Sequence, residues 1–96
     1  MQVDLSTAIM LYSKSQYSEA IDILLVILEE ERQNWRAWFY LALTYADTGR
    51  VEDGVRIMQV ISTLCPDKVL KLKARISKAE LERVIPKDVE RTRLTA

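Results

Sequence analysis

The 96-residue sequence predicts an all-α fold built from antiparallel helix–turn–helix repeats, with about five helices. The chain has only two Gly and two Pro residues, whereas turn-rich β folds use more of both. Apolar residues recur at helical spacing, as at positions 5, 8, 9, 11 and 12. The chain also matches itself at a shift of 34 residues, which aligns residues of the same size class: Ala8 with Ala42, and Ala20 with Gly54.

The first copy of the repeat, residues 1–34, divides into two expected helices. The first covers about residues 3–14. Ser18 is the candidate N-cap of the second, because its hydroxyl can accept a backbone N–H that would otherwise lack a partner. That second helix is expected to end near residue 31.

The second copy, residues 35–68, has the same two-helix organisation. Its first helix is expected over residues 35–48. Gly49 then ends it, since glycine adopts the left-handed conformation that terminates helices. Its second helix is expected over residues 51–64, with Pro66 preventing continuation.

One more helix and a tail complete the expected organisation. Asp67 is placed to cap a helix over about residues 68–84, which forms the capping segment 69–85. Residues 86–96 alternate charged and small polar groups and are expected to be a flexible tail. All these segments form one domain.

The second copy resembles the tetratricopeptide repeat. The family pattern is Trp-x2-Leu-Gly-x2-Tyr, then Ala-x3-Phe, then Pro. The residues at that spacing are Trp38, Leu41, Ala42, Tyr45, Gly54, Met58 and Pro66. The first copy keeps the small residues Ala8 and Ala20 but departs from the pattern at Asp4, Thr7, Leu11 and Arg32. The resemblance implies two repeats followed by a helix that solvates the end of the array.

The resemblance also implies a site. In this family the first helix of each pair lines a concave groove that binds a peptide or a partner helix. The positions that would face such a groove are Leu5, Ile9 and Tyr12, then Phe39, Tyr40 and Leu43, then Leu70, Lys73 and Ser77. Most are apolar, which favours an amphipathic helix as the ligand. The alternative is that these side chains only shield one another.

The helix expected over residues 18–31 indicates a second interface. Its core needs only Ala20, Ile21, Leu24, Ile27 and Leu28. Ile23, Leu25 and Val26 are then left on the outer side, and exposed apolar residues of this kind usually mark an interface. The expected partner is another chain or a second copy of this one.

Composition disfavours catalysis and cofactors. The chain has no His and one Cys, so the commonest general base, the main nitrogen ligand for metals and two-Cys motifs are missing. It has no glycine-rich phosphate loop. We therefore expect no enzyme activity, no metal, no cofactor and no small-molecule substrate. Cys65 is expected to pack, and Trp35 to be partly exposed.

Charge and hydropathy limit the partners. The formal net charge is zero, which gives no field for nucleic acid. The longest apolar run, residues 23–28, is too short for membrane insertion. The unpaired cysteine and the absence of a secretory signal favour the cytoplasm.

These observations predict a protein-binding adaptor or chaperone, with small type III secretion chaperones as a specific model. The alternative is a self-assembling homo-oligomer. Residues 1–34 carry six acids against two bases, and residues 67–96 carry nine bases against five acids, so the two ends have net charges of −4 and +4. The basic stripe of Lys68, Lys71, Arg75 and Lys78 could contact phosphate, an acidic partner or the acidic end of another copy.

Overall fold

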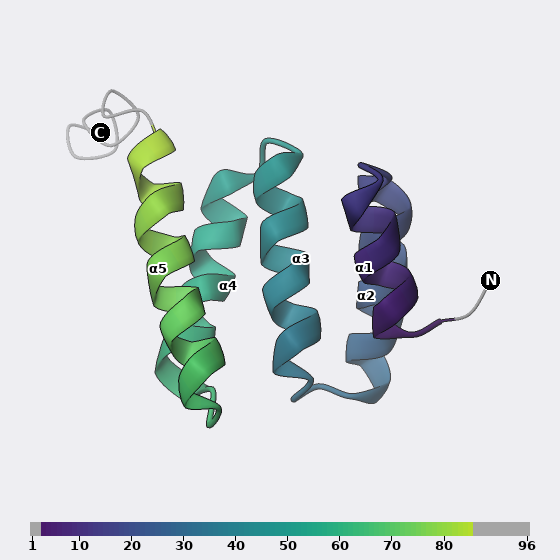
Figure 1. Ribbon diagram of the computed structural model, residues 1–96, viewed down its shortest axis with the longest axis horizontal. Coiled ribbons are helices and arrows are strands. Elements are labelled where there is room, and N and C mark those ends of the chain that lie inside the picture. Colours follow the sequence, from purple (N-terminus) through teal and green to yellow (C-terminus); the bar gives the residue numbers. More distant parts are fainter. Residues whose placement is uncertain (1–2, 86–96) are drawn as a thin grey trace, which may run out of the picture.

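Five α-helices follow one another along residues 3–85, the part of the chain that the computed structural model describes (Figure 1). Their bounds are α1 Leu5–Ser13, α2 Tyr17–Glu30, α3 Trp35–Asp47, α4 Val51–Leu64 and α5 Lys68–Val84. No strand occurs within these residues. The all-α prediction is therefore confirmed. The tail expected over residues 86–96 lies outside the described part.

The helices form an array in which each one packs against the next. In addition, α1 contacts α3, and α3 contacts α5. Figure 1 shows α1, α3 and α5 in front, with α2 and α4 behind them. The array is elongated, with extents of 46 × 29 × 21 Å. Paired antiparallel helices thus recur along the chain, as a helical repeat requires.

The helix ends from α3 onward agree closely with the sequence. Gly49 follows α3 with a φ of +93°, the left-handed conformation expected of it. The Asp67 carboxylate accepts hydrogen bonds from the backbone N–H groups of Val69 and Leu70 at 2.9 and 3.1 Å. These bonds satisfy donors that the first turn of α5 leaves without an intrahelical partner.

The start of α1 explains one departure from the tetratricopeptide pattern. Asp4 stands where the family has Trp, and it is the N-cap residue of α1. Its carboxylate accepts the backbone N–H of Thr7 at 2.8 Å, which lowers the pKa of Asp4 below its ordinary value. The first helix of this repeat therefore starts about one turn later than α3 does.

The Ser18 cap prediction is wrong. Helix α2 begins at Tyr17, its N-cap residue is Gln16, and no side chain caps it. The reason is the tight turn before α2, where Ser15 has a φ of +62°. This turn reverses the chain early enough that Ser18 already lies inside the helix.

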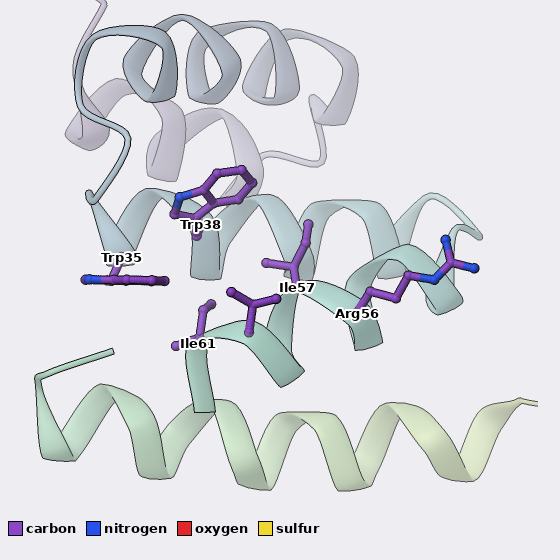
Figure 2. A pocket seen from close by; sticks show the side chains of 6 residues that line it. Trp35, Trp38, Arg56, Ile57 and Ile61 are labelled. Carbon is purple, nitrogen blue, oxygen red and sulfur yellow. The ribbon is translucent and has the colours of Figure 1, made fainter. Parts of the chain in front are cut away.

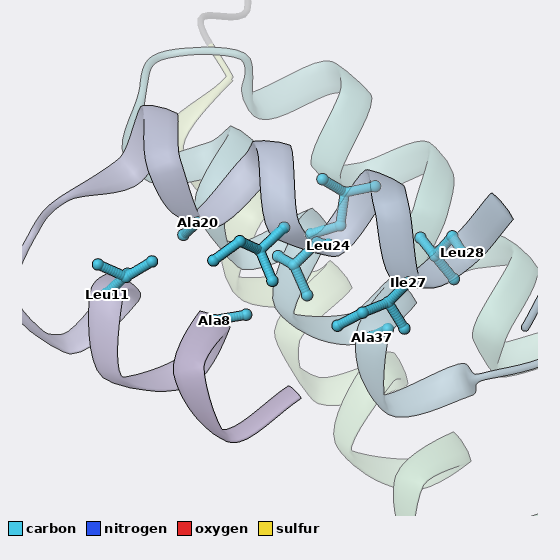
Figure 3. Packing of buried hydrophobic residues seen from close by; sticks show 9 residues of the cluster. Ala8, Leu11, Ala20, Leu24, Ile27, Leu28 and Ala37 are labelled. Atoms are coloured by element: carbon cyan, nitrogen blue, oxygen red, sulfur yellow. The ribbon is translucent and has the colours of Figure 1, made fainter. Parts of the chain in front are cut away.

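Two clusters of buried side chains hold the array together. The first joins α1, α2 and α3 (Figure 3). Its members are Ala8, Leu11, Ala20, Ile23, Leu24, Ile27, Leu28, Ala37 and Leu41. The second joins α3, α4 and α5, and its members are Ala42, Met58, Ile61, Cys65 and Ala74. Leu24 and Met58, 34 residues apart, are both fully buried, so the repeat in sequence is also a repeat in packing.

Small residues allow the paired helices to cross closely. Ala8 and Ala20 are fully buried at the α1–α2 crossing. At the α3–α4 crossing, a Cβ added to Gly54 would lie 2.8 Å from the backbone oxygen of Ala42. That distance is shorter than a normal contact, so the second pair crosses more tightly than a side chain would permit.

Candidate binding surfaces

Aromatic side chains expected in the groove lie together on α1 and α3. The ring centroids of Tyr12 and Tyr40 are 6.0 Å apart, and those of Tyr40 and Phe39 are 5.9 Å apart. Tyr17 of α2 extends this row, with its centroid 5.9 Å from that of Tyr12. All four rings are half-buried. Three of the residues predicted for the groove are therefore brought into one row.

Tyr12 is fixed within that row by a long-range hydrogen bond. Its hydroxyl donates to the carboxylate of Asp47, at the end of α3, over 2.8 Å. Partial burial and the bond to this carboxylate raise the pKa of Tyr12 to about 12. The bond ties the end of α1 to the end of α3.

The residues predicted for the groove on α5 differ in burial. Leu70 packs against the second cluster, whereas Lys73 is exposed. The loop before α5 has three residues, where the loop before α3 has four. The N-cap residues Asn34 and Asp67 are consequently 33 residues apart rather than 34.

The shift of 33 identifies two residues that the sequence analysis missed. It aligns Leu41, 1% exposed, with Ala74, 0% exposed, so the buried faces of α3 and α5 correspond. The counterparts of Phe39 and Leu43 are then Leu72 and Ile76, which are 53% and 52% exposed. The spacing of the two cap residues was the signal in the sequence that could have revealed them.

These alignments define a surface that we call the front face. Each of α1, α3 and α5 contributes two apolar residues at equivalent positions. They are Leu5 and Ile9, Phe39 and Leu43, and Leu72 and Ile76. The residues on α1 and α3 are half-buried, and those on α5 are exposed. None of the six is charged.

The basic stripe of α5 occupies a different side of that helix. At the shift of 33, Lys68, Lys71 and Arg75 correspond to Trp35, Trp38 and Ala42, which pack with the second cluster beside α4. A further helix packed on α5 in the same way would have to bury these charges, which is costly. The stripe is thus suited to end the array, as the resemblance implied.

One prediction for the outer side of α2 is wrong. Ile23 is only 7% exposed and belongs to the first cluster. Ala20, Ile23, Leu24, Ile27 and Leu28 follow the spacing of a single helical face, and this face is the one that α1 and α3 cover. Leu25 and Val26 are on the outer side as expected, 43% and 44% exposed.

The structure also contains a pocket that the sequence analysis did not predict. It has a volume of about 180 Å³ and lies between α3 and α4 (Figure 2). The side chains that line it are Trp35, Trp38, Arg56, Ile57, Val60 and Ile61. The Trp38 indole N–H donates to the backbone oxygen of Arg32 over 2.8 Å, which fixes one wall. Two tryptophans three residues apart, opposite Ile57, Val60 and Ile61, were the available signal.

The first repeat has a different hollow at the matching place. Val26 and Ile27 take the positions of Val60 and Ile61, and Asp4 takes that of Trp38. Glu30 and Glu31 also line it. The matching hollow is therefore acidic, and the aromatic pocket belongs to the second repeat alone.

Residues 3–85 offer little for metal chemistry or membrane crossing. No three Cys, Asp or Glu side chains within them are grouped so that they could hold a metal ion. None of the five helices combines the length and apolar character needed to cross a bilayer. Comparison of the chain with protein-family models, curated proteins and solved structures gave no match.

Proposed function

We propose that this chain is a protein-interaction module of the tetratricopeptide type that binds an amphipathic helix of a partner protein along the front face. The observation that carries this proposal is the placement of apolar residues at equivalent positions of α1, α3 and α5. An amphipathic helix presents a stripe of apolar residues of this kind, and laying it on an apolar surface is a common mode of recognition.

The exposed part of the front face supplies the expected affinity. Leu72 and Ile76 are about half exposed and would be covered by the ligand. Burying such a side chain fully contributes about 1.5–3 kcal/mol before the entropy of association is subtracted. Phe39 and Leu43 would add contact area with little loss of entropy, because packing against the second cluster already orders them.

Charges beside the front face favour an acidic side on the ligand helix. Lys73 is exposed next to Leu72. Helix α5 as a whole carries six basic and two acidic residues. An adaptor and a chaperone would both use this surface; a chaperone would also keep its partner in solution, which co-expression tests directly.

A pull-down with matched variants tests the proposal. The variant Leu72→Glu/Ile76→Glu changes only exposed side chains, so the fold should persist, as circular dichroism can check. The control is Leu64→Glu, which alters a residue of α4 that is 64% exposed and outside the front face. We expect the intact chain and the control to recover the same partner, and the double variant to lose at least 90% of it, since two buried charges would oppose binding. Equal recovery by all three would exclude the front face as the site.

A further inference from the structure

We propose that copies of this chain associate head to tail, with Leu25 of one copy inserted into the aromatic pocket of the next. The pocket is the one lined by Trp35, Trp38, Arg56, Ile57, Val60 and Ile61. None of these residues belongs to the front face, so this inference is independent of the function proposed above.

The size of the pocket selects a single side chain as its ligand. Sites for small molecules generally occupy about 300–1,000 Å³. The volume here is about 180 Å³. An apolar cavity of about 150 Å³ is large enough to hold benzene. The aromatic pocket therefore fits one leucine-sized group and is too small for a typical metabolite.

The lining of the pocket requires that group to be apolar. Ile57, Val60 and Ile61 line it opposite the two indole rings. The indole N–H of Trp38 already donates to the backbone oxygen of Arg32. Val60 is 46% exposed, so the mouth of the pocket is open to a side chain from outside.

Helix α2 of a second copy carries a suitable group. Leu25 is 43% exposed, with Val26 beside it at 44%. Exposed Asp22 and Glu29 lie three residues before Leu25 and four after it, which places both carboxylates close to it on the helix surface. Helix α2 as a whole has four acidic residues and no basic one. Leu25 is therefore an apolar side chain between two acids.

The charges around the pocket complement those acids. Among the described residues that line it, Arg56 alone is charged, and its side chain is 73% exposed. Figure 2 shows the Arg56 guanidinium turned outward, away from both tryptophans, where it can meet a carboxylate at the rim. It lies 3.5 Å from Asp53, which makes a closer bond of 2.8 Å with Arg50. Arg32 is a second cation near the pocket, because its backbone oxygen accepts the indole N–H of Trp38.

The same charges select the second-repeat pocket over the hollow in the first repeat. Asp4, Glu30 and Glu31 line that hollow and would repel an acidic helix. Since α2 and the pocket are different surfaces, each copy that has formed one contact keeps its other surface free. Such heterologous contacts extend into chains unless they close into a ring.

One anchor and a few ion pairs make a small interface, so we expect a dissociation constant on the order of 100 μM that rises with salt.

Complementary variants test the proposal by sedimentation velocity over a concentration series. Val60→Lys blocks the pocket and leaves α2 intact. Leu25→Lys removes the inserted side chain and leaves the pocket intact. Both positions are exposed, so both variants should fold. We expect each variant alone to stay monomeric, and an equimolar mixture of the two to form dimers, because the mixture restores one complete contact.

Two further measurements make the result specific. Both tryptophans of the chain line the pocket, so association should shift their fluorescence emission to shorter wavelength. Leu72→Glu, on the front face, should associate like the unaltered chain. The proposal is overturned if the unaltered chain stays monomeric at roughly ten times the expected dissociation constant. It is equally overturned if the mixture stays monomeric or if association leaves tryptophan emission unchanged.

Discussion

At the scale of single residues, Tyr12 makes the stability of the packed helices depend on pH. Its hydroxyl donates to Asp47 and its ring contacts Tyr40, so it fastens α1 to α3 at one end of the front face. The protonated phenol is favoured in the folded chain, where its pKa is about 12 instead of the ordinary 10.0. This preference stabilises the fold fully below pH 10, and the contribution is lost as the pH rises from about 10 to about 12.

The variant Tyr12→Phe should change that pH dependence. At neutral pH we expect a loss of no more than about 1 kcal/mol in the free energy of unfolding, because the hydrogen bond is partly exposed. Between pH 10 and 12 the stability of the unaltered chain should fall more steeply than that of the variant. Urea unfolding at a series of pH values measures both. The other three tyrosines are common to the two proteins, so parallel curves would contradict the assigned role of Tyr12.

At the scale of helices, the α3–α4 crossing depends on Gly54. Alanine in a helix is favoured over glycine by about 1 kcal/mol, so propensity alone would make Gly54→Ala stabilising. The crossing opposes this, because the new Cβ would meet the Ala42 backbone oxygen at 2.8 Å and a backbone atom cannot rotate away. Forcing extra atoms into a packed interior costs about 1–3 kcal/mol. The free-energy cost of the close approach should therefore exceed the gain from helix propensity.

We expect Gly54→Ala to lower the free energy of unfolding by about 1 kcal/mol in urea titration. Gly49→Asn is the matched control. Its added Cβ meets nothing within 4 Å, and asparagine tolerates the positive φ at this position. The control should unfold near the midpoint of the unaltered chain. A higher midpoint for Gly54→Ala would show that the helices can move apart at little cost.

At the scale of the whole molecule, α5 stabilises the array and does not merely cover its end. Ala74 is fully buried in the second cluster, and Leu70 and Leu81 pack against that cluster. In arrays whose elements contact only near neighbours, stability is a sum of local terms. Loss of the α4–α5 contact would therefore expose the second cluster before the first.

The same substitution at two alanines of α5 tests whether this helix stabilises the array. Ala74→Glu places a carboxylate in the seam between α4 and α5, and we expect a loss of about 3 kcal/mol or more. Ala79→Glu changes an exposed residue and should stay within about 0.5 kcal/mol of the unaltered chain. Hydrogen exchange should show faster amide exchange in α4 and α5 of the first variant than in α1 and α2. Uniform exchange throughout would mean that the array unfolds as one unit.

Much of this architecture follows from local chemical signals that are present in the sequence. Gly49, Pro66 and Asp67 mark the ends of α3, α4 and α5, because a left-handed glycine, a missing N–H and a capping carboxylate act within a few residues. Ala8 and Gly54 mark the helix crossings for a similar reason: only small side chains fit there.

Other features depended on tertiary structure because they compare residues far apart in the chain. Because the loop before α5 is one residue shorter than the loop before α3, Leu72 and Ile76 take the positions equivalent to Phe39 and Leu43. Leu70 is partly buried against the second cluster. Ile23 is buried because both α1 and α3 pack on α2. Together they cover a wider part of the helix surface than the sequence analysis assigned to the core. The aromatic pocket is lined by residues of both α3 and α4, so it forms only where these two helices pack together. The sequence by itself determined where the helices from α3 onward begin and end and where the paired helices cross, since those signals are local. Only packing determined which side chains remain available to a partner.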